Sequence, residues 1–255
     1  MKLRQRILLA VFAGLSLLVL TLPPQVGAAE SAVVAQSIGQ TPIQRDKEYP
    51  WMSIERWKSM VAAQEARASQ GNVDLMFVGD SITEGWKEPL WSTYFGQFHP
   101  ANFGVGGDHT GNLLWRLQQA PLRQLHPKTI VLLIGVNNLN LIPETTSQTA
   151  AGIVAVVASL RQNYPDAKIL LNGVFPYSQL GSSDKRVQIQ ELNRALALLG
   201  DEKHVFFRDY GHNFLDEHGD ISAEVMADFL HPTAKGYQIW ADAMLPDIRK
   251  LMQGP

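Results

Sequence analysis

The chain has 255 residues, of which 45% are hydrophobic and 18% are charged, and its formal net charge is −2. These values are typical of a globular protein of about one α/β domain, and the near balance of charge gives no reason to expect a nucleic-acid partner. Cysteine is absent, which excludes cysteine nucleophiles, thiolate metal sites, disulfide bonds and a lipid anchor on cysteine.

Residues 1–28 are typical of a secretory signal peptide. Basic residues at positions 2, 4 and 6 precede an apolar run over residues 7–22, and small residues follow at 27–29. The run has 16 residues, fewer than the ~20 that span a bilayer comfortably. We therefore predict cleavage after Ala28 or Ala29, with an uncleaved membrane anchor as the alternative. Cleavage leaves 19 Lys and Arg against 24 Asp and Glu, a net charge of −5, in a periplasmic or secreted protein.

Residues 29–50 are rich in Ala, Ser, Gln and Pro without apolar periodicity, which predicts a linker before a domain that covers residues 51–255. Within this domain, helical and strand-like patterns alternate. In chain order we predict a helix at 53–68, a strand at 73–78, a strand at 101–105, a helix at 110–119, a strand at 129–134, a helix at 146–163, a strand at 168–174, a helix at 184–199, a strand at 204–207 and a final helix from Pro232 or Thr233.

This alternation predicts an α/β fold, in which a parallel sheet is covered by helices on both faces. Active sites in such folds lie beyond the carboxyl ends of the strands, so the loops that follow the strands should gather at one edge of the sheet. Those loops contain Gly-Asp-Ser (79–81), Gly-Val-Gly-Gly-Asp (104–108), Gly-Val-Asn-Asn (135–138) and Phe-Pro-Tyr (175–177).

The first of these loops contains a conspicuous serine. Ser81 and Glu84 fit the S-x-x-E capping box, in which the two side chains satisfy free backbone N–H groups at a helix start. The alternative is that Ser81 is a nucleophile. The two interpretations are compatible, because a serine at a helix N-terminus has a free backbone N–H that can stabilise an anion.

The glycine-rich loop does not fit a nucleotide site. His109 stands where the dinucleotide pattern needs its third glycine, and no Lys-Ser/Thr follows as in a P-loop. Gly106 and Gly107 either make a tight turn or present a backbone N–H to an oxyanion. Asn137 and Asn138 likewise either serve a turn or offer a side-chain amide to the same charge.

Among the seven histidines, His231 has the most suggestive neighbour. Asp228 precedes it by three residues, a spacing that lets the carboxylate reach the imidazole Nδ1–H and leaves Nε2 free as a base. An aspartate cap beside an incidental histidine is the alternative. Asp216, His218 and Asp220 have no metal-site spacing such as HExxH, and we predict neither a metal nor another cofactor.

The joint pattern is more specific than its parts. The α/β-hydrolase elbow G-x-S-x-G is not met, because Thr83 stands in place of the second glycine. However, Gly-Asp-Ser, Gly-Gly-Asp, Gly-x-Asn-Asn and Asp-x-x-His, in this order, resemble the SGNH (GDSL-type) hydrolases. The stretches NFGVGGDHTGNLLWRL (102–117) and DFLHPTAKGY (228–237) are similar to the α-subunit type of platelet-activating-factor acetylhydrolase. Many relatives have Asp at the position of Asn138, but the acetylhydrolase-like branch shares Asn. The resemblance runs from Trp51 to the C-terminus.

The resemblance implies a three-layer α/β/α sandwich, flavodoxin-like with a five-stranded parallel sheet, and an esterase without a metal. It implies that Ser81, Asp228 and His231 form the catalytic triad. It also implies that the backbone N–H groups of Ser81 and Gly107 and the side-chain amide of Asn137 form the oxyanion hole.

We expect an exported serine esterase that hydrolyses short-chain, acetyl-type carboxylic esters. Ile82 and Leu230 flank the catalytic positions and are candidates to limit acyl length, while Trp86, Trp91 and Tyr177 are candidates for the alcohol side, with core packing as their alternative role. A lysophospholipase or thioesterase for longer acyl chains, an acyltransferase, and a non-catalytic carbohydrate-binding relative are the rival functions. The expected partner is a small-molecule or carbohydrate ester, not a nucleotide or nucleic acid, with membrane contact only through the signal segment. The sequence does not predict an oligomeric state.

Overall fold

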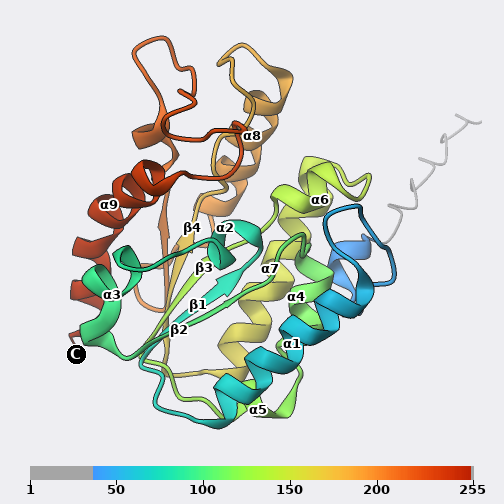
Figure 1. The fold of residues 1–255 in the computed structure, drawn as a ribbon, viewed down its shortest axis with the longest axis vertical. Helices are drawn as coiled ribbons and strands as arrows, with labels where there is room; N and C mark the ends of the chain where they lie inside the picture. The colour runs from blue at the N-terminus through green and yellow to red at the C-terminus, as the bar shows by residue number, and fades with distance from the viewer. Residues whose placement is uncertain (1–36, 254–255) are drawn as a thin grey trace, which may run out of the picture. The chain divides into compact units, whose positions relative to one another are not determined.

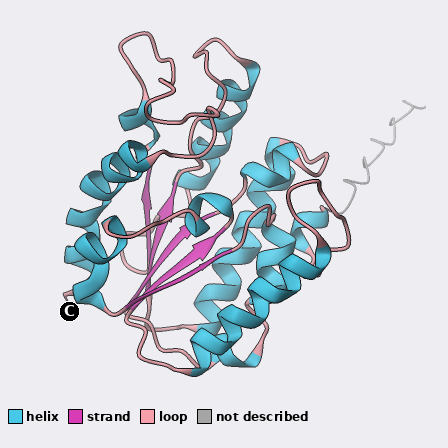
Figure 2. Ribbon diagram, viewed as in Figure 1, coloured by secondary structure: helices cyan, strands magenta, loops and turns pink. Residues whose placement is uncertain are grey.

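The structure, a computed structural model, describes residues 37–253 (Figures 1 and 2). Five parallel strands form one sheet in the order β2-β1-β3-β4-β5. This is the flavodoxin-like strand order, so the predicted α/β fold with a five-stranded parallel sheet is confirmed. The strands are β1 (Leu75–Gly79), β2 (Pro100–Gly104), β3 (Thr129–Leu133), β4 (Lys168–Asn172) and β5 (Val205–Arg208).

Helices cover both faces of the sheet. The group α1, α4, α5 and α7 lies on one face, and α3 and α9 lie together on the other (Figure 1). The α8 helix packs against α7. The helices are η1 (Ile38–Gln40), α1 (Ile54–Ser69), α2 (Ser81–Glu84), α3 (Leu90–Phe95), η2 (Gly96–Phe98), α4 (Thr110–Arg116), α5 (Ala120–Arg123), α6 (Val136–Asn140), α7 (Thr146–Asn163), α8 (Asp184–Ala197), η3 (Gly211–Phe214) and α9 (Ala234–Met252). None of those in this part of the chain combines the length and apolar content needed to cross a membrane.

The predicted elements are all present, with boundaries that shift for local reasons. The predicted helix at 146–163 has the observed bounds, since Thr145 and Gln148 form a capping box at its start. The last helix begins at Ala234 because Thr233 is its N-cap and accepts a hydrogen bond from the N–H of Gly236. The short helices α3 and α6 were not predicted, because they are too brief to show a helical period.

Residues 37–50, predicted as part of a linker, pack against the domain instead. We call residues 37–53 the amino-terminal arm. The N–H of Gly39 donates to Glu144 Oε1 at 2.8 Å, and the N–H of Ile43 donates to the carbonyl of Gly111 at 3.0 Å. The arm is held by such polar contacts to distant residues, which leave no periodic pattern in the sequence. The predicted signal peptide at 1–28 lies outside the described residues.

Candidate active site

Ser81 stands at the junction of β1 and α2, at the carboxyl end of a central strand. The predicted capping box is not formed. Asp80 is the N-cap, and its carboxylate accepts a hydrogen bond from the N–H of Ile82 at 3.0 Å. Ser81 is the first residue of the helix, as predicted, while Glu84 accepts a hydrogen bond from the N–H of Gly106 at 2.7 Å. The serine hydroxyl is therefore free of the capping role.

The structure brings Ser81, His231 and Asp228 into one hydrogen-bonded chain. Ser81 Oγ lies 2.9 Å from His231 Nε2, and His231 Nδ1 lies 2.6 Å from Asp228 Oδ2. These are the spacings that let a histidine take a proton from a serine while a carboxylate orients the ring. Residues separated by 150 positions in the chain thus meet at the predicted edge of the sheet.

A tight turn at Phe229 holds the Asp228 carboxylate in place. Phe229 has φ 58, in the left-handed region, and the turn directs the N–H groups of Leu230 and His231 to Asp228 Oδ1 at 3.1 and 2.7 Å. Partial burial alone would raise the pKa of Asp228, but the hydrogen bonds from the His231 side chain and from these backbone groups outweigh it and hold the pKa below its ordinary value. These hydrogen bonds therefore favour the ionised carboxylate, which can balance the charge of a protonated imidazole.

The three donors that the family resemblance implies for an oxyanion hole lie beside the Ser81–His231–Asp228 hydrogen bonds. Among residues 37–253, no group accepts a hydrogen bond from the N–H of Ser81 or of Gly107. Asn137 Nδ2 donates one proton to the carbonyl of Asp108 at 3.0 Å, which fixes the amide, and its second proton has no acceptor within the described part of the chain. Ser81, Gly107, Asn137 and His231 all line one cleft of about 420 Å³.

Asp108 anchors the loop that carries Gly107. Its buried carboxylate accepts hydrogen bonds from Arg116 Nε at 2.7 Å and from Trp57 Nε1 at 2.7 Å. Arg116 also donates to the carbonyls of Gly79 at 3.1 Å and Phe103 at 2.9 Å. One buried arginine thus ties the ends of β1 and β2 to the loop after β2.

Asn138, the residue that departs from the pattern of many relatives, has a structural role. Its Nδ2 donates to Thr110 Oγ1 and to Glu144 Oε2, both at 2.7 Å, and its Oδ1 accepts from the N–H of Thr110 at 3.1 Å. An aspartate here could not donate to Glu144, which in turn holds the amino-terminal arm through Gly39. The asparagine therefore suits the way the arm is attached.

The residues predicted to contact substrate divide into two groups. Leu230 lines the cleft, as predicted. Ile82 and Tyr177 are 1% and 4% exposed and belong to the core. Trp86 packs against Tyr237 and Trp240 at ring-centroid distances of 4.7 and 5.0 Å, so its alternative role in core packing is the one the structure gives it.

The cleft also has walls that sequence reasoning missed. Trp51 and Met52 of the arm, Arg56 of α1, and Asn140 and Leu141 after β3 all line it. Nothing in the sequence indicated that the arm reaches the catalytic edge.

The protein-family comparison decides the family. Residues 77–239 match the GDSL-like lipase/acylhydrolase family model. The chain belongs to this family. The predicted SGNH (GDSL-type) membership is thereby confirmed, and with it the expectation of a carboxylic ester hydrolase.

Relatives of this GDSL-type hydrolase include the human platelet-activating factor acetylhydrolase IB subunits alpha1 and alpha2. Each is 33% identical over 185 residues, which cover 71% of this chain and 78% of alpha1, and 72% of this chain and 79% of alpha2. A GDSL-like lipase from Bacteroides thetaiotaomicron has the same fold with a TM-score of 0.60 and 22% identity, over 77% of this chain and 97% of its own. An acetylxylan esterase from Geobacillus stearothermophilus also has this fold, with a TM-score of 0.55 and 21% identity over 68% of this chain and 93% of its own.

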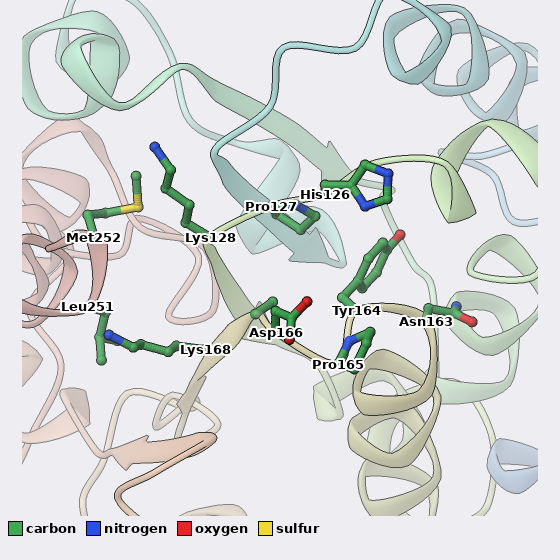
Figure 3. Close-up of a pocket in the computed structure, with 11 residues that line it drawn as sticks. His126, Pro127, Lys128, Asn163, Tyr164, Pro165, Asp166, Lys168, Leu251 and Met252 are labelled. Carbon is green, nitrogen blue, oxygen red and sulfur yellow. The ribbon is translucent and has the colours of Figure 1, made fainter. Parts of the chain in front are cut away.

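A second cavity of this GDSL-type hydrolase, of about 410 Å³, lies at the opposite ends of the strands (Figure 3). It is lined by His126 and Lys128 before β3, by Tyr164 and Lys168 beside the start of β4, and by the end of α9. Its volume is close to the 420 Å³ of the cleft at Ser81, so volume does not distinguish the two. Chemistry does, because no serine or threonine is among the residues that line this cavity.

Proposed function

We propose that this carboxylic ester hydrolase is an exported serine esterase that removes short acyl groups, acetyl above all, from an alcohol or sugar hydroxyl. The observation that carries the proposal is the hydrogen-bonded chain from Asp228 through His231 to Ser81. Its position at the carboxyl ends of the strands, in the cleft that also contains Gly107 and Asn137, supports it.

In this mechanism, His231 Nε2 takes the proton of Ser81 Oγ as the oxygen attacks the ester carbonyl. The negative charge that develops on the carbonyl oxygen is stabilised by the N–H groups of Ser81 and Gly107 and by the amide of Asn137. The intermediate collapses to an acyl-serine as protonated His231 gives its proton to the departing alcohol. A water deprotonated by His231 then attacks the acyl group, and the acid leaves as Ser81 regains its proton.

The lining of the cleft supports a short acyl group and a polar alcohol. Besides the proposed catalytic residues, the cleft is lined by the apolar side chains of Trp51, Met52, Leu141 and Leu230 and by the charged or polar side chains of Arg56, Glu84 and Asn140. A long acyl chain needs a continuous apolar groove, since each polar group that it covers would lose hydration. The names of two similar proteins, an acetylhydrolase and an acetylxylan esterase, agree with acetyl as the acyl group.

Export rests on the signal-peptide pattern of residues 1–28 and is compatible with the absence of cysteine. Expression of the full chain in a bacterial host, with the amino terminus of the mature protein sequenced from the periplasm, tests it. A protein retained at full length in the cytoplasm would refute export.

The substrate proposal is tested by hydrolysis of p-nitrophenyl esters with acyl chains from acetyl to palmitoyl, and of acetylated sugars. Activity should be highest with the shortest chains, and both Ser81→Ala and His231→Ala should reduce it to background. Retained activity in Ser81→Ala would refute the mechanism. A maximum at octanoyl or longer chains would favour the lysophospholipase or thioesterase function instead.

A further inference from the structure

Gly106, the residue before the proposed oxyanion donor Gly107, is hydrogen-bonded to side chains through both its N–H and its carbonyl. The N–H of Gly106 donates to Glu84 Oε2 at 2.7 Å, and the carbonyl of Gly106 accepts a hydrogen bond from Arg45 Nη2 at 2.9 Å. That carbonyl belongs to the same peptide group as the N–H of Gly107, the proposed oxyanion donor. Arg45 therefore binds the oxygen end of the peptide group whose N–H would stabilise the oxyanion.

This contact is made in a sheltered place. The Arg45 side chain is 3% exposed, its Nη2 lies 3.4 Å from Asp108 Oδ1, and the ring of Tyr49 covers it at 5.7 Å from Cζ to centroid. Within residues 37–253, nothing accepts a hydrogen bond from Arg45 Nε or Nη1. Burying a guanidinium with two nitrogens unpartnered is unfavourable. The contacts of Nη2 with Gly106 and Asp108 are the polar interactions that offset this cost.

The contact acts on the peptide in two ways. A charged donor on the carbonyl oxygen polarises the peptide group, which makes the N–H at its other end a stronger donor, and the low polarity of the surroundings increases this effect. The hydrogen bond also fixes the peptide plane. Two successive glycines offer little resistance to a peptide rotation, and Gly107 has φ 72, so without Arg45 the direction of the Gly107 N–H is held less firmly.

We propose that Arg45, supplied by the amino-terminal arm, is a positioning residue of the oxyanion hole that acts through the Gly106–Gly107 peptide. The inference rests on the proposed role of the Gly107 N–H. It gives the arm a part in the reaction: the arm is a component of the active site and not a tether in front of it.

The test compares Arg45→Met, which removes the donor, Arg45→Gln, which keeps a neutral N–H, and Arg45→Lys, which keeps the charge. Arg161→Met is the matched control, because Arg161 also donates to a backbone carbonyl, that of Ala167 at 2.9 Å, at the other end of the sheet. Each variant is assayed with p-nitrophenyl acetate at a temperature at which circular dichroism shows it folded.

Loss of an oxyanion donor lowers kcat by roughly 100- to 1,000-fold, and an indirect effect should be smaller, so we expect a fall of about 10- to 100-fold in Arg45→Met. KM should change little, Arg45→Gln and Arg45→Lys should keep progressively more of kcat, and Arg161→Met should keep all of it. A merely structural role would not produce this graded loss in kcat at constant KM.

A folded Arg45→Met enzyme with the kcat of the wild type would overturn the inference while leaving the proposed function intact. If that variant does not fold, equal kcat values for wild type, Arg45→Lys and Arg45→Gln would overturn it as well. Activity retained in Ser81→Ala would instead overturn the proposed function, and this inference with it.

Discussion

Glu84 accepts a hydrogen bond from the backbone N–H of Gly106 at 2.7 Å. Glu84 is the last residue of the helix that begins with Ser81, and Gly106 immediately precedes Gly107 in the loop after β2. A single carboxylate therefore links the proposed nucleophile to the proposed backbone donor of the oxyanion hole. Charge-assisted hydrogen bonds of this kind are short and about twice as strong as neutral ones.

Removing this link should loosen the oxyanion hole without removing any catalytic group. For Glu84→Ala we expect kcat for p-nitrophenyl acetate to fall by about tenfold, a small part of what loss of a whole donor costs. Glu84→Gln keeps an acceptor oxygen and should retain most of the activity. Steady-state kinetics of the two variants decide the point. Equal losses of kcat in both variants would show that the hydrogen bond from Gly106 to Glu84 does not support activity.

The Arg116–Asp108 ion pair should be the largest polar contribution to stability near the site. Removing one partner of a buried ion pair costs about 3–5 kcal/mol, and Arg116→Met would leave Asp108 with only the longer ion pair to Arg45 at 3.4 Å, so it should lower the free energy of unfolding by about 3 kcal/mol. The exposed pair of Lys128 and Asp74 provides the control, since Lys128→Met should cost at most about 1 kcal/mol. Urea denaturation of both variants measures the contrast. Similar values for the two would contradict the role assigned to Arg116.

Asp80 should make stability depend on pH. Its burial raises the pKa of the carboxyl group to about 7, from an ordinary value of 3.8. Between these values the folded protein holds a proton that the unfolded chain has released, so this group makes folding less favourable as the pH rises toward 7. Asp80→Asn keeps the acceptor for the N–H of Ile82 but cannot ionise.

The midpoint of thermal unfolding, measured for wild type and Asp80→Asn from about pH 5 to about pH 8, checks this expectation. The midpoint of Asp80→Asn minus that of the wild type should increase as the pH rises. A difference independent of pH would show that the folded protein does not hold this proton.

Trp51 should affect substrate binding more than chemistry. It is 47% exposed, stacks on Tyr49 at a centroid distance of 5.0 Å and forms a wall of the cleft. In Trp51→Ala we expect KM for an acetylated sugar to rise by about 3- to 10-fold with kcat nearly unchanged, as for a contact made equally in ground and transition states. Leu198→Ala, at a residue 87% exposed, is the control and should change neither constant. A fall in kcat at constant KM would contradict this role.

Much of the fold and the core of the site follow from the sequence because both depend on the strands. Ser81, Gly107 and Asn137 each follow a predicted strand, and parallel strands bring their carboxyl ends to one edge. The Asp228–His231 spacing is local, so it too is readable from the sequence. Glu84 was assigned to a capping box because its contact with Gly106, 22 positions away, leaves no local pattern.

The arm and the aromatic residues show where such reading fails. Arg45 reaches Gly106 across 61 positions of the chain, in a segment without periodicity. Trp86 was a candidate for the alcohol side, with core packing as its alternative role. The helix that begins at Ser81 turns Trp86 into the core beside Tyr237 and Trp240, which lie some 150 residues further on.

Ser81 is the proposed nucleophile, and every other role assigned to the site depends on it. The most direct test mixes the enzyme with p-nitrophenyl acetate, stops the reaction with acid within the first turnovers and locates any acetyl group by peptide mass spectrometry. We expect an acetyl group on Ser81 in the wild type and no adduct in Ser81→Ala. An acetyl-enzyme that carries the group on another residue, or turnover with the same adduct pattern in Ser81→Ala, would contradict it.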